Sequence, residues 1–122
     1  MVGKVLQEWL TVRGAAGQVL SQSHASYLDL SDFDDVVLYL DVREETGSPT
    51  LTFQSGISAD DASLLPIAPV LTLAASSAPV VTRVLAAYSA TPLARFLRWQ
   101  LTSASAWDAT FRITLAAYAP GV

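Results

Sequence analysis

The sequence predicts an all-β protein, an antiparallel β-sandwich or jelly roll of about eight short strands. Three observations predict this fold class. Apolar and polar residues alternate with a period of two in several segments, turn-forming residues separate these segments, and no segment has the apolar period of a long helix. We expect residues 1–122 to form a single β-sandwich domain, in which residues 1–7 either join a strand or form a loose N-terminal arm.

The strand candidates near the N-terminus are short. They cover residues 8–13, 18–23 and 26–30. Gly14 and Gly17 separate the first two, because glycine weakens a strand and favours a turn. Several brief strands are therefore expected in this part of the chain.

The most regular alternation covers residues 35–43, whose inward positions are all apolar: Val36, Leu38, Leu40 and Val42. Residues 50–55 alternate in the same way, with Leu51 and Phe53 facing inward. Residues 44–49 contain a glycine and a proline, which indicates a turn. We expect the two strands to form a hairpin.

The C-terminal part repeats this pattern. Residues 93–101 alternate between apolar and polar positions, and residues 107–118 place Phe111, Ile113 and Leu115 on one face. The small polar residues 103–106 indicate a turn between them. A second hairpin is expected here.

The middle of the chain is less regular. Pro66 and Pro69 exclude a stable helix over residues 64–75 and favour a loop or an edge strand at its start. Strands are expected over residues 70–74 and 80–88, although residues 84–88 are rich in alanine and are also compatible with a helix.

Composition and charge exclude several classes of protein. Hydrophobic residues make up 52% of the chain and charged residues 15%, which excludes intrinsic disorder. The net charge of −4 and the pI of about 4.6 argue against a nucleic-acid partner, because binding phosphates requires a basic surface. The apolar excess predicts that part of the surface is covered by a partner.

The charges are divided unevenly along the chain. Residues 1–61 carry three basic and ten acidic side chains, whereas residues 62–122 carry four basic and one acidic. We expect the two halves to attract each other inside one molecule. The alternative is head-to-tail association of copies.

The sequence also limits the compartment and the chemistry. Cysteine is absent, which excludes disulfides and thiolate sites. No apolar run is long enough to span a membrane as a helix, and Glu8 interrupts the apolar core that a signal peptide would need. We therefore expect synthesis in the cytoplasm and no membrane association.

Few residues are suited to catalysis. His24 is the only histidine, and no GxSxG nucleophile turn, phosphate-binding loop or cofactor motif is present. We predict that the protein is not an enzyme and has no cofactor. The acidic run Asp32, Asp34 and Asp35 offers oxygen ligands for calcium, but the spacing of an EF-hand is missing, and a polar turn capped by aspartates is the alternative.

Six aromatic and cationic residues are candidates for an interaction surface: Trp9, Arg95, Arg98, Trp99, Trp107 and Arg112. The tryptophans suit either a stacking platform for a ligand or the core of the sandwich. The arginines suit either one cationic row that meets a carboxylate-rich partner or pairing with the acidic half of this chain.

Several segments carry a family resemblance: WLTVRG, YLDL, DDVVLYLDVREETGSPTLTFQS and PLARFLRWQLTSASAWDATFRITLAAY. Together they resemble small β-sandwich virion proteins of tailed bacteriophages, in particular capsid decoration (cement) proteins. The resemblance implies a non-enzymatic protein made in the host cytoplasm and placed on the capsid surface of the virion. It also implies binding to the major capsid protein or another virion protein, formation of a homo-oligomer, and stabilisation of the shell.

The last of these segments is also similar to the closing strands of galactose-binding and discoidin-like jelly rolls. This second resemblance implies a carbohydrate- or surface-binding module on a tail or particle. Asparagine is absent from the chain, which removes one side chain that often binds sugar hydroxyls.

Overall fold

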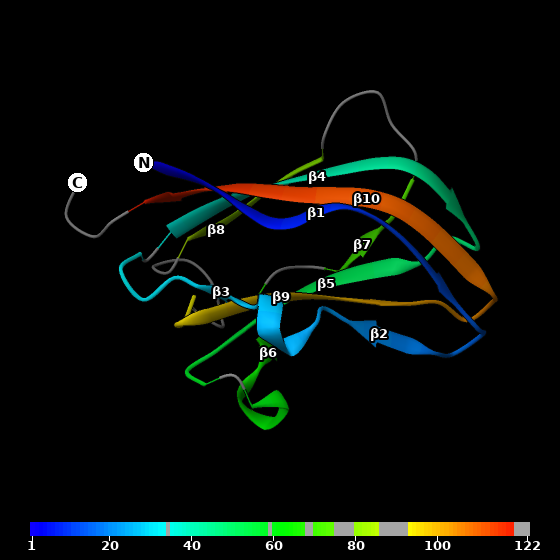
Figure 1. The fold of residues 1–122 in the computed structure, drawn as a ribbon, viewed down its shortest axis with the longest axis horizontal. Helices are drawn as coiled ribbons and strands as arrows, with labels where there is room; N and C mark the ends of the chain where they lie inside the picture. The colour runs from blue at the N-terminus through cyan, green and yellow to red at the C-terminus, as the bar shows by residue number, and fades with distance from the viewer. Residues whose placement is uncertain (34, 59, 68–69, 75–79, 86–92, 119–122) are drawn as a thin grey trace.

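Two antiparallel sheets lie face to face in the computed structural model of this chain (Figure 1). The structure describes residues 1–122 with the exception of residues 34, 59, 68–69, 75–79, 86–92 and 119–122. It gives only the backbone for residues 24, 61 and 80–85.

We call the two layers sheet A and sheet B. The strands of sheet A, in spatial order, are β1 (Val2–Gly14), β10 (Trp107–Tyr118), β4 (Asp35–Thr46) and β8 (Val80–Leu85). The central path of sheet B is β2 (Val19–Ser21), β9 (Phe96–Thr102), β5 (Thr50–Gly56) and β6 (Leu65–Pro66). The short strand β3 (Leu28–Asp29) pairs with β9, and β7 (Leu71–Thr72) pairs with β5. Two 3₁₀ turns, η1 (His24–Ser26) and η2 (Asp61–Ser63), complete the described elements.

The strand order is that of a jelly roll. Strands β2 and β3 share one side of β9, and β6 and β7 share one side of β5, so each pair fills one strand position. The chain then passes between the sheets in the order A, B, A, B, B, A, B, A, which gives two four-position sheets linked as Greek keys. The predicted fold class, an antiparallel sandwich of about eight strand positions, is confirmed.

Both predicted hairpins are wrong. Strand β4 pairs with β10 and β8, whereas the next strand, β5, pairs with β9 in the other sheet. Strands β9 and β10 are divided between the sheets in the same way. The turns at residues 47–49 and 103–106 therefore carry the chain across the core, from one layer to the other. Because the apolar side chains of both strands face the core in either arrangement, the alternation alone does not distinguish a hairpin from such an arch.

Residues 2–7 do not form a separate arm. They lie within β1, where Val2 pairs with Ala117 and Leu6 is buried. The physical reason is that β10 is a long central strand that needs a hydrogen-bonding neighbour on each side, and the N-terminal residues provide one of them. The short strands β2 and β3 lie within the predicted segments 18–23 and 26–30.

The strands in the middle of the chain lie at the edges of the two sheets. Strands β6 and β7 each have two residues and lie beyond β5, which agrees with the edge position expected for a proline-containing segment. Strand β8 begins at Val80, as predicted. Residues 86–88 of the predicted segment lie outside the described residues.

The core lies between the sheets and contains the side chains that the alternation placed inward. Members from four strands include Leu38, Phe53, Trp99 and Phe111, and the rings of Trp99 and Phe111 meet edge to face at a centroid distance of 5.1 Å. In the described part of the chain, no helix is long and apolar enough to cross a membrane.

Candidate interaction face on sheet A

The outward faces of the two sheets differ in chemistry. Residues paired across an antiparallel ladder point to the same face, so the strand register shows which side chains lie together. On sheet B most outward positions are polar, with Val19 and Phe96 as apolar exceptions; the polar ones include Ser21, Thr52, Gln54, Arg98, Gln100 and Thr102. On sheet A several outward positions are apolar or aromatic, although sandwich strands normally alternate apolar inward and polar outward.

We define the sheet A face by these outward residues. Its apolar part consists of Val5, Val37, Tyr39, Ala116 and Tyr118, and next to it lies a cluster of Trp9, Asp41, Arg43 and Arg112. Val5 is 47% exposed and Tyr118 is 40% exposed, whereas Ala116 is buried, so the described residues of the chain cover this surface only in part.

Trp9 lies on this face at a bulge of β1. The pairing passes from Gln7 opposite Ile113 to Leu10 opposite Phe111, which leaves Glu8 and Trp9 together against one position of β10. A bulge of this kind redirects a side chain out of the regular alternation. The indole of Trp9 is therefore 39% exposed.

Two arginines lie over the ring of Trp9. The guanidinium carbon of Arg43 is 4.5 Å from the ring centroid, and that of Arg112 is 5.1 Å from it. Arg43 faces outward like Val37, Tyr39 and Asp41 before it, and the pairing of β4 and β10, which skips from Glu44 to Val42, leaves it without a partner residue on β10. Trp9 and Arg43 thus each lie at a bulge, on the strands β1 and β4 that flank β10.

The two arginines differ in their polar contacts. Nη2 of Arg112 lies 3.3 Å from Oδ2 of Asp41, and the two residues are direct partners on neighbouring strands. Arg43 is exposed and contacts Trp9, and it makes no hydrogen bond or ion pair with any residue that the structure describes. Its guanidinium is therefore free to bind a carboxylate of another molecule in a bidentate manner.

Arg95 and Arg98 lie elsewhere, so the three predicted arginines do not form one row. Arg98 is only 5% exposed, and it donates from Nε to Oε1 of Gln54 at 2.7 Å and from Nη1 to the hydroxyl of Tyr27 at 2.6 Å. The row is absent because β9 and β10 belong to opposite sheets. Arg98 is a structural residue of sheet B.

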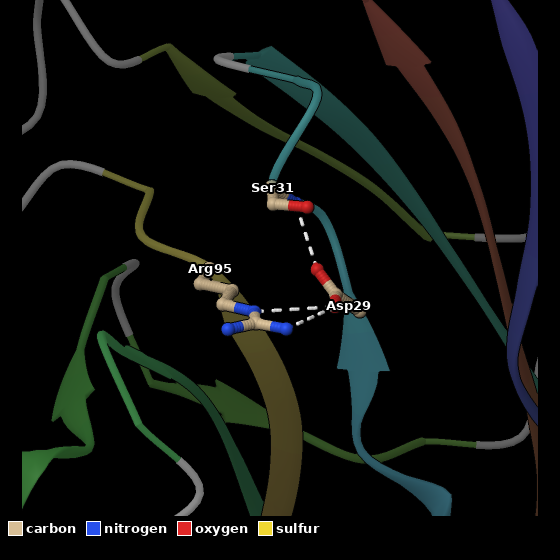
Figure 2. A network of polar contacts seen from close by, with 3 residues as sticks. All are labelled: Asp29, Ser31 and Arg95. Atoms are coloured by element: carbon tan, nitrogen blue, oxygen red, sulfur yellow. Dashed lines mark hydrogen bonds and ion pairs between the residues drawn. The ribbon is translucent and has the colours of Figure 1, made fainter.

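Arg95 pairs with Asp29, as Figure 2 shows. Its Nη2 lies 3.1 Å from Oδ2 of Asp29, and the backbone N–H of Ser31 donates to Oδ1 of the same carboxylate at 3.0 Å. These contacts lower the pKa of Asp29, the Ser31 N–H more than the guanidinium. Together with Asp41–Arg112, this ion pair joins the acidic half to the basic half, as expected for attraction within one molecule.

The other two predicted tryptophans are part of the core. Trp99 and Trp107 are 2% and 3% exposed, so neither contributes to a surface platform. Nε1 of Trp99 donates to Oε1 of Gln7 at 3.1 Å. The core interpretation of these two residues therefore fits the structure.

The structure does not bring a calcium site together in its described part. Asp32 is exposed in the turn before β4, Asp35 is the first residue of β4, and Asp34 lies outside the described residues. No group of three metal-ligating side chains occurs among the residues that are described. His24 lies in η1, and its side chain is also outside the description.

Sequence reasoning missed the residues that complete the sheet A face. Arg43, Val5 and Tyr118 follow the alternation of their strands, and nothing in the sequence marks them as neighbours of Trp9. The signal in the sequence was that the segments of β1, β4 and β10 carry apolar residues at outward positions, in addition to their apolar inward positions.

Comparisons with known proteins assign no family. No protein-family model matches the chain, and no curated protein matches it. Among solved structures, the chain is similar to one from Bacillus endospore appendages, described as a novel family of disulfide-linked pili. The two chains are 18% identical, the match covers 98% of this chain and 91% of that chain, and the TM-score is 0.48. The jelly-roll fold of this chain is established by its own strand pairings.

Proposed function

We propose that this jelly roll is a non-enzymatic structural protein of a tailed-phage virion, a capsid decoration protein that binds the outer surface of the shell through the sheet A face. The observation that supports this function is the group of apolar and aromatic side chains on an outward sheet face. In the proposed role the protein is made in the host cytoplasm and resides on the virion, with the major capsid protein as its partner.

The chemistry of the sheet A face suits protein binding. Tryptophan, tyrosine and arginine are enriched among the residues that contribute most to protein interfaces, and Trp9, Tyr39 and Arg43 lie together here. The apolar part excludes water around them, which strengthens a charged contact made by Arg43. Many copies on one particle then hold the shell together even where each single contact is weak.

A sugar-binding role is the alternative, and one observation favours it: the half-exposed indole of Trp9. A sugar ring stacks on an open aromatic face. The guanidiniums of Arg43 and Arg112 lie over this indole, so a sugar would have to displace them. For this reason we place protein binding first.

The test is co-sedimentation with empty shells assembled from the major capsid protein of a tailed phage whose genome carries this gene. We expect the wild-type protein to sediment with the shells. Trp9→Ala and Arg43→Ala are each expected to lower the affinity for the shells by about tenfold or more, as for residues that contribute much of the binding free energy of an interface. The matched control is Val19→Ser, which changes an exposed apolar residue on sheet B.

Two results would contradict the proposal. One is a wild-type protein that does not sediment with the shells. The other is a Trp9→Ala variant that binds as tightly as the wild type. A glycan panel distinguishes the sugar-binding alternative from protein binding. A sugar ligand would raise the melting temperature of the wild type and not that of Trp9→Ala.

A further inference from the structure

We infer that the sheet A face also binds a second copy of this chain, whose tip between β5 and β6 docks on it head to tail. The tip consists of Ile57, Ser58, Asp60, Ala62 and Ser63. The inference rests on the proposed use of the sheet A face as a docking surface, and it names a second partner for that face, which competes there with the shell.

The tip presents an unusually exposed apolar residue. Ile57 is 80% exposed, the highest value among the large hydrophobic residues of the described chain. Leu65, in the strand that follows the tip, is 54% exposed. These two side chains leave apolar surface exposed at one end of the domain.

The tip is held by its own hydrogen bonds. The hydroxyl oxygen of Ser63 lies 2.9 Å from the carbonyl oxygen of Ser58 and 2.9 Å from that of Asp60, and both carbonyls accept from it. The backbone N–H of Ser63 donates to the carbonyl of Asp60 at 3.0 Å. Gly56 lies so close to Ser63 that a Cβ atom would be 2.4 Å from the Ser63 carbonyl oxygen. A preorganised tip loses little conformational entropy when it binds.

The tip also carries negative charge. Asp60 is exposed, and its Oδ1 accepts a hydrogen bond from the N–H of Ala62 at 3.3 Å. This contact fixes the carboxylate and occupies one of its oxygens. The tip thus offers an aliphatic side chain beside a carboxylate. The sheet A face offers an apolar surface beside the guanidinium of Arg43, which has no hydrogen-bond or ion-pair partner among the residues that the structure describes.

These two surfaces cannot meet within one molecule. In Figure 1, β6 and the η2 turn lie beyond sheet B, on the side away from sheet A. Contact between them therefore requires two copies and joins unlike surfaces. Such a heterologous contact closes into a ring or continues as a filament, depending on the rotation between copies.

The experiment uses two variants of the full chain in sedimentation velocity. The face variant is Trp9→Ala with Arg43→Ala, and the tip variant is Ile57→Ser with Asp60→Asn, which keeps the side-chain oxygen that caps Ala62. We expect the wild type to associate with increasing concentration, and each variant alone to have an association constant about tenfold lower or more. Thermal unfolding of both variants verifies that they remain folded.

Mixing the two variants gives the decisive measurement. The face variant keeps an intact tip and the tip variant keeps an intact face, so an equal mixture is expected to form 1:1 dimers that do not grow further. Val19→Ser serves as the control for an unrelated exposed apolar residue and is expected to associate like the wild type.

The inference is overturned if the wild type stays monomeric, if the tip variant alone associates like the wild type, or if the mixture stays monomeric. Association of the tip variant alone would mean that sheet A faces bind each other. Co-sedimentation tests binding to the shell separately from these measurements. Failure of the self-association is therefore distinguishable from failure of the proposed shell binding.

Discussion

Gly14 at the end of β1 lies directly against the indole of Trp107 at the start of β10. A Cβ atom at residue 14 would be 2.3 Å from both Cε2 and Nε1 of Trp107. Trp107 is buried, and its Nε1 has no hydrogen-bond partner among the described residues, so the ring is held by packing alone. The glycine is therefore required by space at this position.

We expect Gly14→Ala to destabilise the fold by about 1–3 kcal/mol, because the added methyl group overpacks a site with no free volume. Urea unfolding measures the change. Gly3→Ala is the matched control in the same strand, since no atom lies within 4 Å of its added Cβ, and it is expected to be neutral or slightly stabilising. A Gly14→Ala variant as stable as Gly3→Ala would contradict the close contact.

Gln22 provides a second structural prediction. Its buried side chain donates to the carbonyls of Leu6 and Ser26, each at 2.8 Å, and its Oε1 accepts from the backbone N–H of Trp99 at 3.3 Å. These bonds connect β1, η1 and β9 at the bulge of β1. We expect Gln22→Leu to lower the free energy of unfolding by roughly 2–3 kcal/mol, because buried backbone groups lose their partners.

The control for this variant is Gln18→Ala. Its side chain caps an exposed turn by accepting from the N–H of Ala15, so water replaces the lost bond. The expected loss is below about 1 kcal/mol. If both glutamine variants lost the same stability, the connecting role of Gln22 would be wrong.

The strands could be predicted from the sequence, but their partners could not. Alternation at Val36 and Leu38 identified β4 and its buried face, and Leu51 and Phe53 did the same for β5. In a hairpin or in an arch these residues face the same core, so burial does not decide between the two. The partner of β4 is β10, far away in the sequence, and pairing at that distance depends on the whole fold.

The candidate site was predictable only in part. Trp9 and Arg112 were singled out as residue types, but their contact depends on the bulge at Glu8 and Trp9, which no glycine or proline marks. Arg98 was assigned to a surface row, whereas the structure buries it against Gln54. A bulge arises from the fit of two strands and is not visible in either strand alone.

The carboxylate of Asp29 predicts a specific dependence on pH. Its pKa is lowered by the Ser31 N–H and then by Arg95, so the charged form is favoured in the folded state. A lowered pKa gives stability that is present above the ordinary pKa of an aspartate and is lost as the pH falls through the lowered value. The carboxylate lies at the surface, so the effect on stability is small.

NMR titration of the Asp29 carboxyl measures this pKa directly. Arg95→Gln is expected to raise it only part of the way to its ordinary value, because the Ser31 N–H still donates. Asp29→Asn is expected to make unfolding less sensitive to pH in the acidic range. An Asp29 pKa at its ordinary value in the wild type would refute the arrangement in Figure 2.

Fluorescence quenching tests the exposure and the surroundings of Trp9. Of the three tryptophans, only Trp9 is accessible, so we expect acrylamide to quench one component of the emission and Trp9→Phe to remove that component. The guanidiniums of Arg43 and Arg112 attract anions, so iodide should quench this component more strongly than caesium. The difference should shrink in Arg43→Gln and at high salt, because screening weakens exposed charges. An accessible component that persists in Trp9→Phe would mean that Trp99 or Trp107 is exposed, and the sheet A face would then lose its central residue.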